Sequence, residues 1–383
     1  MFLALRDLRF ATGRFALMGS VVALISLLLV MLSGLTAGLG GQNTAAIDRL
    51  GEQGVQRLVF GGAAGQEPTA SFTQSEFTVA QRDAWAATDG VASVEPLGVS
   101  QGRAVGLEHP VDTDPQRRAD VSGEPTTGVA TTAFIGLTPG GSDAPAGVEP
   151  GQIVLSQDVA DSLHAQTGDA VAVSGFVYTV ANVVPTEYYS HSPVTWLALE
   201  DWNAISHTAD DAVLGTAGLV RVDAGADVDA VAAAGDDAAG TVAETVKGSY
   251  AALPSYRSEN GSLMTMQGFL YGISALVVIA FLSIWTVQRT RDIAVLKALG
   301  GSNGWVLKDS LAQAAFVLVG GVAVGTGLAA VIGAFAGRAV PFELSWATTA
   351  VPAAGVLVLG MLAAVVAVFR VTRIDPLVAL GGN

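Results

Sequence analysis

The sequence has no cysteine, only three lysines and few charges, since charged residues make up 14% of its 383 positions. The absence of cysteine excludes disulfides, thiolate metal ligands, a cysteine nucleophile and a lipid-modified cysteine anchor. None of the lysines, Lys247, Lys297 and Lys308, has the glycine spacing of the phosphate-binding loop GxxxxGK(S/T). The chain therefore does not hydrolyse ATP by itself, and we expect no permanently bound cofactor.

Motifs of extracellular catalysis and metal binding are also missing. The sequence contains no GxSxG motif, which is typical of α/β hydrolases. Its four histidines form no HxxxH or HxH pair that would bind a metal from one element: His109, His164, His191 and His207. The acidic residues of segment 223–237 lack the spacing of a calcium loop. We therefore expect no catalytic residue and no resident metal, and the chain is not expected to be an enzyme.

Hydrophobic residues make up 51% of the sequence and its mean hydropathy is +0.49, which favours a membrane protein. The net charge of −15 is unevenly distributed. Segment 42–262 contains 9 basic and 29 acidic residues, a net of −20, and the rest of the chain contains 10 basic and 5 acidic residues, a net of +5. Because so acidic a region repels phosphates, a nucleic-acid partner is excluded.

Four stretches without a charged residue are long enough to cross a bilayer, because about 20 apolar residues in a helix span its hydrocarbon core. These stretches are 15–47, 260–288, 310–337 and 344–369. We expect the transmembrane helices themselves at 15–39, 263–287, 311–336 and 345–369. Without an acidic or basic residue inside them, the sequence offers no proton relay or ion pathway.

The basic residues predict the orientation, because Lys and Arg concentrate on the cytoplasmic side of membrane proteins. Nine of the ten basic residues outside 42–262 lie before the first span, between the second and third, or after the fourth, and Arg338 alone lies on the other side. We therefore predict an α-helical membrane protein with four transmembrane helices, both termini in the cytoplasm, and a large α/β extracytoplasmic domain inserted between helices 1 and 2. The predicted parts are an amphipathic N-terminal segment (1–14), helix 1 (15–39), the extracytoplasmic domain (40–262), helix 2 (263–287), a cytoplasmic coupling loop (288–310), helix 3 (311–336), a short outer loop (337–344), helix 4 (345–369) and a cytoplasmic tail (370–383).

Two glycine pairs in the third span have the small-xxx-small spacing that lets membrane helices approach closely. They are Gly321 with Gly325 and Gly333 with Gly337. Packing within one chain and a face between two copies of the chain both fit this spacing.

Segment 40–262 has the pattern of a globular α/β domain. Segment 78–98 predicts a helix and then a strand from Val91 to Val94, and segment 151–185 predicts a strand, a helix opened by Ser156, and two strands joined at Ser174 and Gly175. A further strand at 196–199 and a short helix at 201–205 follow. Segments 61–68, 138–150 and 223–240 predict loops or poorly packed insertions.

The loop between the second and third spans predicts a short amphipathic helix from Thr290 onward. Its apolar residues Ile293, Leu296 and Leu299 share one side, and Gly300 ends it. Such a helix fits either the inner leaflet of the membrane or the groove of a partner protein.

Residues 291–300, RDIAVLKALG, resemble the R-x-E/D-I-a-x-L-K/R-A-L-G signature of ABC permeases in the MacB/FtsX superfamily. Residues 4–19, ALRDLRFATGRFALMG, resemble the amphipathic N-terminal helix of that family, and residues 373–380, RIDPLVAL, resemble its R-x-D-P-x-x-A-L tail. Segments 78–98 and 151–185 are similar to its extracytoplasmic domain. Asp292 stands where Glu is commoner, which preserves the carboxylate.

The resemblance implies a permease homodimer in the plasma membrane of a bacterium, partnered by two separate cytoplasmic ABC ATPase subunits that bind ATP and Mg. The ATPase pair would close on binding ATP, and the coupling loop would transmit this motion outward, to act on a substrate in contact with membrane lipid. This mechanism is called mechanotransmission. The implied coupling residues are Arg291, Asp292, Ile293, Leu296, Lys297, Leu299 and Gly300.

Four spans, one moderately large outer domain and no fused ATPase resemble the haem-exporter (HrtB-like) permeases of Gram-positive bacteria, which makes haem our preferred substrate. Export of an antimicrobial peptide, a drug or a lipid is the alternative, as is activation of a cell-wall hydrolase without substrate transport.

If haem is the substrate, we expect its ligands where helices 1 and 2 emerge from the membrane. The candidate residues are Asn43, Tyr256, Arg257, Glu259, Met264 and Met266. Each also has an ordinary interpretation as a membrane-flank charge, a packing residue or an interfacial anchor. A second candidate group, with an ordinary interpretation as the lip of a loop, is Glu187, Tyr188, Tyr189 and His191.

Overall fold

The computed structural model describes residues 12–63, 65–109, 118–119, 121, 123–206, 212–288 and 303–372. The chain divides into two compact units. The first comprises Met1–Leu39 with Asn260–Asn383, and we call it the helical unit; the second comprises Gly40–Glu259, and we call it the inserted domain.

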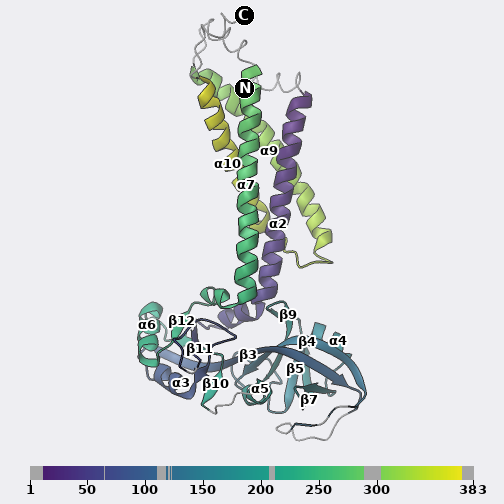
Figure 1. Ribbon diagram of the computed structural model, residues 1–383, viewed down its shortest axis with the longest axis vertical. Helices are drawn as coiled ribbons and strands as arrows, with labels where there is room; N and C mark the ends of the chain where they lie inside the picture. The colour runs from purple at the N-terminus through teal and green to yellow at the C-terminus, as the bar shows by residue number, and fades with distance from the viewer. Residues whose placement is uncertain are drawn as a thin grey trace, which may run out of the picture. The chain divides into compact units, whose positions relative to one another are not determined.

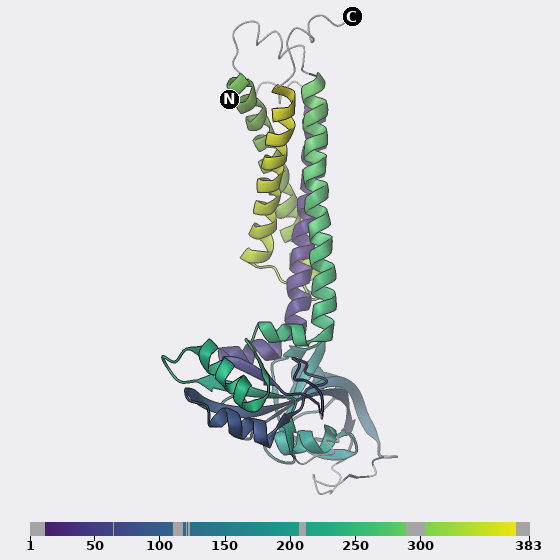
Figure 2. The same cartoon turned by 60° about the vertical axis from the view of Figure 1, so that its left-hand side comes forward.

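Four long helices of the described chain are apolar enough to cross a membrane, and they run alongside one another in the helical unit (Figure 1 and Figure 2). They are α2 (Thr12–Glu52), α7 (Pro254–Gln288), α9 (Asn303–Ala336) and α10 (Trp346–Thr372). Each extends beyond the uncharged stretch that predicts it at one end or both, because the polar residues there are also compatible with a helix. The last residues of α2 and the first of α7 belong to the inserted domain.

Small residues bring α9 against α2. A Cβ atom on Gly321 would lie 2.8 Å from the carbonyl oxygen of Gly19, and one on Gly325 would lie 2.2 Å from that of Ala23. Neither position accepts a side chain without a shift of the backbone. The first glycine pair of the third span therefore packs within the chain, which is the first of the two alternatives that its spacing allows.

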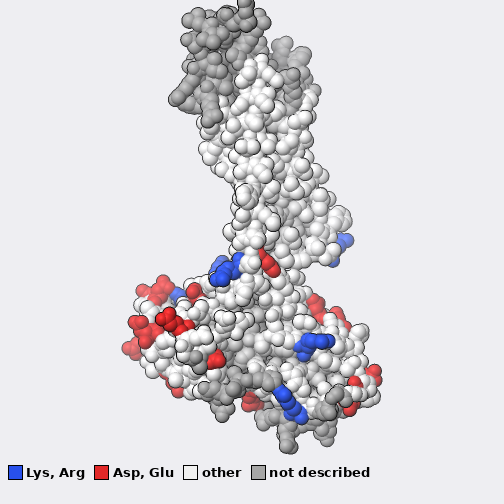
Figure 3. Space-filling view, in the orientation of Figure 1, with Lys and Arg blue, Asp and Glu red and all other residues white. Residues whose placement is uncertain are grey.

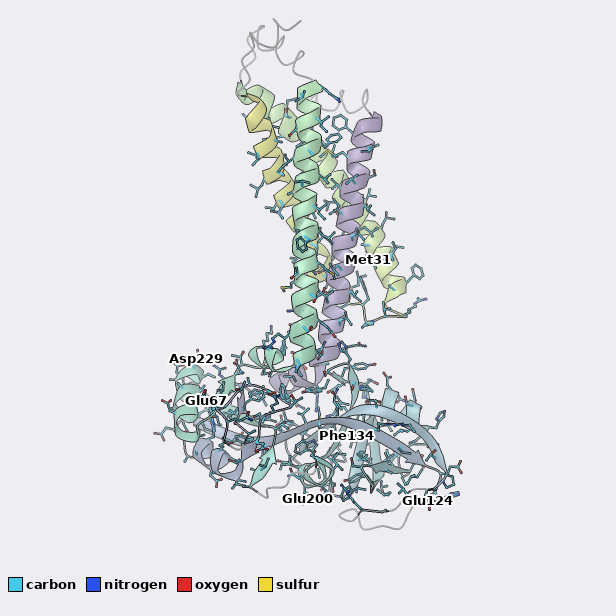
Figure 4. All side chains as sticks on the ribbon, in the orientation of Figure 1. Met31, Glu67, Glu124, Phe134, Glu200 and Asp229 are labelled. Carbon is cyan, nitrogen blue, oxygen red and sulfur yellow. The ribbon has the colours of Figure 1, made fainter. Side chains whose placement is uncertain are left out.

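Six strands of the inserted domain close into a ring. The order is β3 (Val91–Leu107), β4 (Thr126–Leu137), β9 (Ser192–Ala198), β5 (Gln152–Ser156), β7 (Phe176–Val184) and β6 (Ala170–Val173), which pairs again with β3. Its buried side chains include Phe134 of β4, labelled in Figure 4, and they pack with α4 (Gln157–Leu163) and α5 (Leu199–Ser206). The hairpin β8 (Tyr188–Tyr189) pairs with β9.

The first half of β3 belongs to a second layer. It pairs with β11 (Ala217–Val222), and the sheet continues through β1 (Arg57–Phe60) to β12 (Val242–Glu244). Helices α3 (Val79–Ala86) and α6 (Val228–Ala239) cover it around the buried Trp85. A small pair, β2 (Phe77–Thr78) with β10 (Val213–Gly215), and the 3-10 helix η1 (Gly248–Ala252) complete the domain.

Several sequence predictions for this domain are correct. Helix α3 begins after a capping box formed by Thr78 and Gln81, and β3 begins at Val91, although it continues to Leu107. Strand β5, helix α4 and the hairpin β6–β7 follow the predicted order, with the turn at Ser174 and Gly175 in the left-handed conformation. The predicted strand and short helix correspond to β9 and α5.

The prediction of a loop at 223–240 is wrong, because residues 228–239 form helix α6. Asp227 caps the helix by accepting hydrogen bonds from the N–H groups of Asp229 and Ala230. Gly235 lies against the ring of Trp85, where a Cβ atom would come within 2.4 Å. Asp229 and Asp237 are exposed, whereas Asp236 is partly buried and accepts hydrogen bonds from Thr241 Oγ1 and from the N–H of Ala243. Figure 3 shows acidic side chains gathered on this part of the inserted domain.

The last turns of α2 form part of the core of the inserted domain. Ala46, Ile47 and Leu50 are buried against the sheet. Arg49 pairs with Glu187 at 2.9 Å, and its guanidinium carbon lies 5.4 Å from the centre of the Trp196 ring. These contacts fasten the end of α2 to the strands β8 and β9.

Asp201 of α5 provides a pH-dependent test of this fold. Its side chain is buried and accepts a hydrogen bond from the N–H of Gly151 at 2.8 Å. Burial raises the pKa of Asp201 from the usual 3.8 to about 6. The folded state therefore holds this proton more tightly than the unfolded state, so ionisation of Asp201 lowers stability as the pH rises from about 4 to about 6.

We predict that Asp201→Asn, which keeps an acceptor for Gly151 and removes the charge, stabilises the inserted domain by about 2 kcal/mol near neutral pH. The difference from wild type should shrink as the pH falls towards about 4. Urea unfolding of the detergent-solubilised full chain, followed by tryptophan fluorescence at several pH values, measures it. A variant that is less stable than wild type near neutral pH contradicts the prediction.

Candidate functional site

Five polar side chains from three elements of the inserted domain meet in one hydrogen-bonded group, which we call the Asn43 cluster. Its members are Asn43 of α2, Ser190 and His191 of the β8–β9 turn, and Ser255 and Glu259 of α7. Glu259 Oε2 accepts a hydrogen bond from Asn43 Nδ2 at 3.2 Å and lies 2.8 Å from His191 Nε2. Two nitrogen atoms thus converge on one carboxylate oxygen.

Two serines orient the amide of Asn43 within the cluster. Ser255 Oγ donates to Asn43 Oδ1 at 2.8 Å, and it lies 2.8 Å from Ser190 Oγ. The amide is only 1% exposed, whereas the side chains of His191 and Glu259 are 29% and 38% exposed. The cluster therefore combines a buried, oriented amide with an imidazole–carboxylate pair that is partly exposed to solvent.

The turn that presents His191 is strained. Ser190 and His191 have φ values of 48° and 63°, the left-handed region that favours glycine, and together they form the two-residue loop of the β8–β9 hairpin. Such loops usually contain Asn-Gly or Asp-Gly, and a larger residue in this conformation costs about 1 kcal/mol or more. The backbone N–H groups of Ser190 and His191 bond to the carbonyl oxygens of Asn43 and Gln42 at 3.1 and 2.9 Å. Helix α2 therefore holds the strained turn in place.

The structure brings together only part of the first predicted group. Asn43 and Glu259 are in contact, but Tyr256 packs edge-on against Tyr250, with ring centres 5.4 Å apart. Arg257 is exposed on the first turns of α7. Met264 and Met266 lie further along α7 in the helical unit, where their side chains are 63% and 54% exposed.

Of the second predicted group, His191 alone joins the Asn43 cluster. Glu187 pairs with Arg49, and its pKa is raised by burial, against which the nearby Arg49 acts. Tyr188 donates a hydrogen bond to Asp158, which raises the pKa of Tyr188 to about 12. Tyr189 is buried edge-on against Phe72. These three side chains stabilise the hairpin that carries His191.

Sequence reasoning missed Ser190 and Ser255, since neither belongs to a motif. Asn43 is 148 residues from His191 and 216 from Glu259, so only the fold unites them. Among the described residues there is no group of three or more His, Asp or Glu side chains that could hold a metal ion. The predicted coupling residues of segment 291–300 lie outside the described residues.

Comparison with known families identifies the class of protein. Residues 16–238 match the MacB-like periplasmic core domain, and residues 264–376 match the FtsX-like permease C-terminal domain. The chain is an ABC-transporter permease subunit, a multi-pass protein of the plasma membrane with a MacB-like domain between its first and later apolar helices. It belongs to the MacB/FtsX permease family, as its coupling motif predicts, and membership implies a cytoplasmic ABC ATPase partner.

One named relative matches the whole chain, and another matches about a third of it. It is 22% identical over 391 residues, covering 100% of both chains, to the "Putative hemin transport system permease protein HrtB" of Staphylococcus epidermidis. It is 29% identical over 126 residues, 31% of each chain, to the "Uncharacterized ABC transporter permease YknZ" of Bacillus subtilis. The solved extracellular domain of YknZ covers 50% of this chain and 99% of its own, with a TM-score of 0.33 and 13% identity.

The strain at His191 yields a stability prediction. We expect His191→Gly to be about 1 kcal/mol more stable than His191→Ala, because both variants lose the contact with Glu259 but only glycine relieves the left-handed backbone. Urea unfolding of the full chain measures the difference.

His164 supplies the calibration, because it is exposed and also has a left-handed backbone, with φ of 51°. The glycine–alanine difference should be similar at both positions. Equal stability of His191→Gly and His191→Ala, alongside a clear difference at His164, would show that the turn at His191 is not strained.

Proposed function

We propose that the chain is the permease subunit of an ATP-driven exporter that takes an amphipathic substrate, haem, from the outer leaflet of the plasma membrane by mechanotransmission. The observation that carries this proposal is the Asn43 cluster, in which an oriented amide holds a solvent-exposed imidazole–carboxylate pair. The full-length similarity to proteins named as hemin transport permeases supports the same substrate.

The chemistry of haem matches the side chains that the first two turns of α7 and the β8–β9 turn expose. Haem iron accepts histidine, and its propionates pair with cationic side chains. The side chains of His191 and Glu259, which we call the iron-directed pair, would face the haem iron. The exposed guanidinium of Arg257 would pair with a propionate. Met264 and Met266 belong to the helical unit and stay a separate candidate pair, because their exposed thioether sulfurs are also of a type that ligates haem iron.

Mechanotransmission is favoured over passage of substrate through the membrane. The uncharged spans offer no polar path for a substrate that carries two carboxylates. Helix α2 is continuous from the helical unit into the core of the inserted domain, so it is suited to carry a displacement between them. Segment 291–300 would couple this displacement to a cytoplasmic ATPase, which binds ATP and Mg, with both termini of the permease in the cytoplasm.

A homodimer through α7 completes the proposal. This is the least buried of the four long helices. Gly261, Gly268 and Gly272 lie on it with nothing within 4 Å of the position of a Cβ atom, although Gly268 and Gly272 have the spacing of close helix packing. Exposed Phe269 and Leu276 flank them. A second copy of the chain, with membrane lipid around it, would cover this face.

Haem titration tests the substrate. We expect the purified wild-type chain to shift the Soret absorbance of haem, and Glu259→Gln and His191→Gly to weaken haem binding by roughly tenfold or more because each removes half of the iron-directed pair. His164→Gly is the matched control, since it changes an exposed left-handed histidine of the same domain and should bind haem as wild type does.

Two results would contradict this proposal in different ways. Wild type without a Soret shift removes haem as the substrate and leaves the family assignment intact. A wild-type shift that both variants retain leaves haem as the substrate and removes the Asn43 cluster as its site.

Cysteine scanning tests the dimer, because the chain has no native cysteine. We expect single cysteines at Gly268, Gly272 or Leu276 to form disulfide-linked dimers in membranes on mild oxidation, with helical periodicity along α7. Exposed positions of α10, such as Val351 and Val358, are the control and should stay monomeric. Dimers through α10 and none through α7 would reverse the assignment of the face.

A further inference from the structure

The loop between α9 and α10 packs one aromatic ring directly against glycines of two helices. Ring atoms of Phe342 lie 2.3 Å from the Cβ position of Gly34 on α2 and 2.4 Å from that of Gly333 on α9. The backbone of Pro341 lies equally close to the Cβ position of Gly38, at 2.1 Å. We call Gly34, Gly38 and Gly333 the glycine notch. Any side chain at these positions would push the loop out.

Hydrogen bonds fix the loop on both sides of Phe342. The N–H of Glu343 donates to the carbonyl oxygen of Gly34 at 3.0 Å, which joins the loop directly to α2. Towards α10, Ser345 and Thr348 exchange hydrogen bonds at the helix start, and Thr348 Oγ1 also donates to the carbonyl oxygen of Glu343 at 3.0 Å. The loop is thus a short, ordered connection rather than a free linker.

The side chain of Phe342 packs against α2 and α9, whereas its apolar neighbours in the sequence are exposed. Val340, Leu344 and Trp346 are exposed, Trp346 to 83%, as expected for side chains that face lipid. Each glycine within a helix is also unfavourable, by about 1 kcal/mol relative to alanine. The chain therefore places Gly34 and Gly333 where they admit the ring of Phe342, and Gly38 where it admits the backbone of Pro341.

The glycine notch joins α2 to α9 and α10 at the end of α2 that leads to the inserted domain. Further towards the start of α2, Gly321 and Gly325 of α9 make the other close contact with it. Helix α2 also contacts α7, because Gln267 Nε2 donates a hydrogen bond to Thr36 Oγ1 at 3.3 Å. Without the Phe342 ring, this part of α2 would keep its hydrogen bonds to Gln267 and Glu343 and lose the side-chain contact that joins Gly34 to Gly333 of α9.

We propose that Phe342 is a positioning residue for transport: seated in the glycine notch, it makes residues 34–38 of α2 move together with α9 and α10. This inference rests on the proposed function, because it assigns the contact through which motion of α9 and α10 reaches α2. Phe342 touches neither the substrate nor the nucleotide, so its loss uncouples ATP hydrolysis from transport without weakening substrate binding.

Two variants that alter the notch in opposite ways test the proposal. Phe342→Ala empties the notch, and Gly34→Ala fills it while leaving the ring intact. For the permease with its ATPase partner in proteoliposomes, we expect both variants to keep basal ATPase activity within about twofold and the KM for haem within about threefold. The kcat of haem transport should fall roughly tenfold or more.

Controls separate this role from general packing. Gly327→Ala changes a glycine of α9 whose Cβ position has nothing within 4 Å, so it should transport as wild type does. Phe342→Leu refills part of the notch and should restore most of the transport rate. If Phe342→Ala does not yield folded protein, Gly34→Ala and Phe342→Leu still give the comparison.

The outcomes are distinguishable. Transport at the wild-type rate by Phe342→Ala or Gly34→Ala, or an equal loss in Gly327→Ala, overturns the role of Phe342 and leaves the proposed function in place. A rise in the KM for haem that accounts for the loss also overturns it, because the ring would then belong to the binding site. Wild type that does not transport haem overturns the proposed function and this inference with it.

Discussion

The continuity of α2 is the constraint on which the rest of the structure depends. One helix of 41 residues begins among apolar neighbours in the helical unit and ends as part of the hydrophobic core of the inserted domain. Arg221 of β11 secures this end, because it pairs with Asp143 at 2.5 Å and donates to the carbonyl oxygen of Gln53 just beyond the helix. The last turns of α2 therefore belong to the core of the inserted domain although the helix begins in the helical unit.

The Asn43 cluster follows from the same helix. The carbonyl oxygens of Gln42 and Asn43 hold the left-handed turn of Ser190 and His191, which a hairpin alone would not favour. The strain is thus offset by contacts with α2, and the imidazole is presented to Glu259 at the start of α7. Strained residues persist only where their surroundings fix them, and here the carbonyl oxygens of α2 do so.

How much the sequence predicts depends on the range of the interactions. Uncharged runs predict the four long helices, and helical spacing in segment 78–98 and the turn residues Ser174 and Gly175 predict local elements correctly, because these signals lie within a few residues. Helix α6 escapes prediction, since its alanine- and aspartate-rich sequence is stabilised by packing on the distant Trp85. The pairing of Asn43 with Glu259 could be anticipated only because both flank membrane spans, and the serines beside them carry no sequence signal.

Glycine shows why a motif alone does not determine a contact. The spacing of Gly321 and Gly325 and that of Gly268 and Gly272 is the same, yet the first pair is in contact with α2 and the second faces open space. The pair Gly34 and Gly38 has this spacing too, and it receives a loop rather than a helix. Spacing creates a flat, narrow surface in all three cases. What fills that surface depends on which other parts of the chain can reach it, so the same spacing receives a helix at Gly321 and Gly325 and a loop at Gly34 and Gly38.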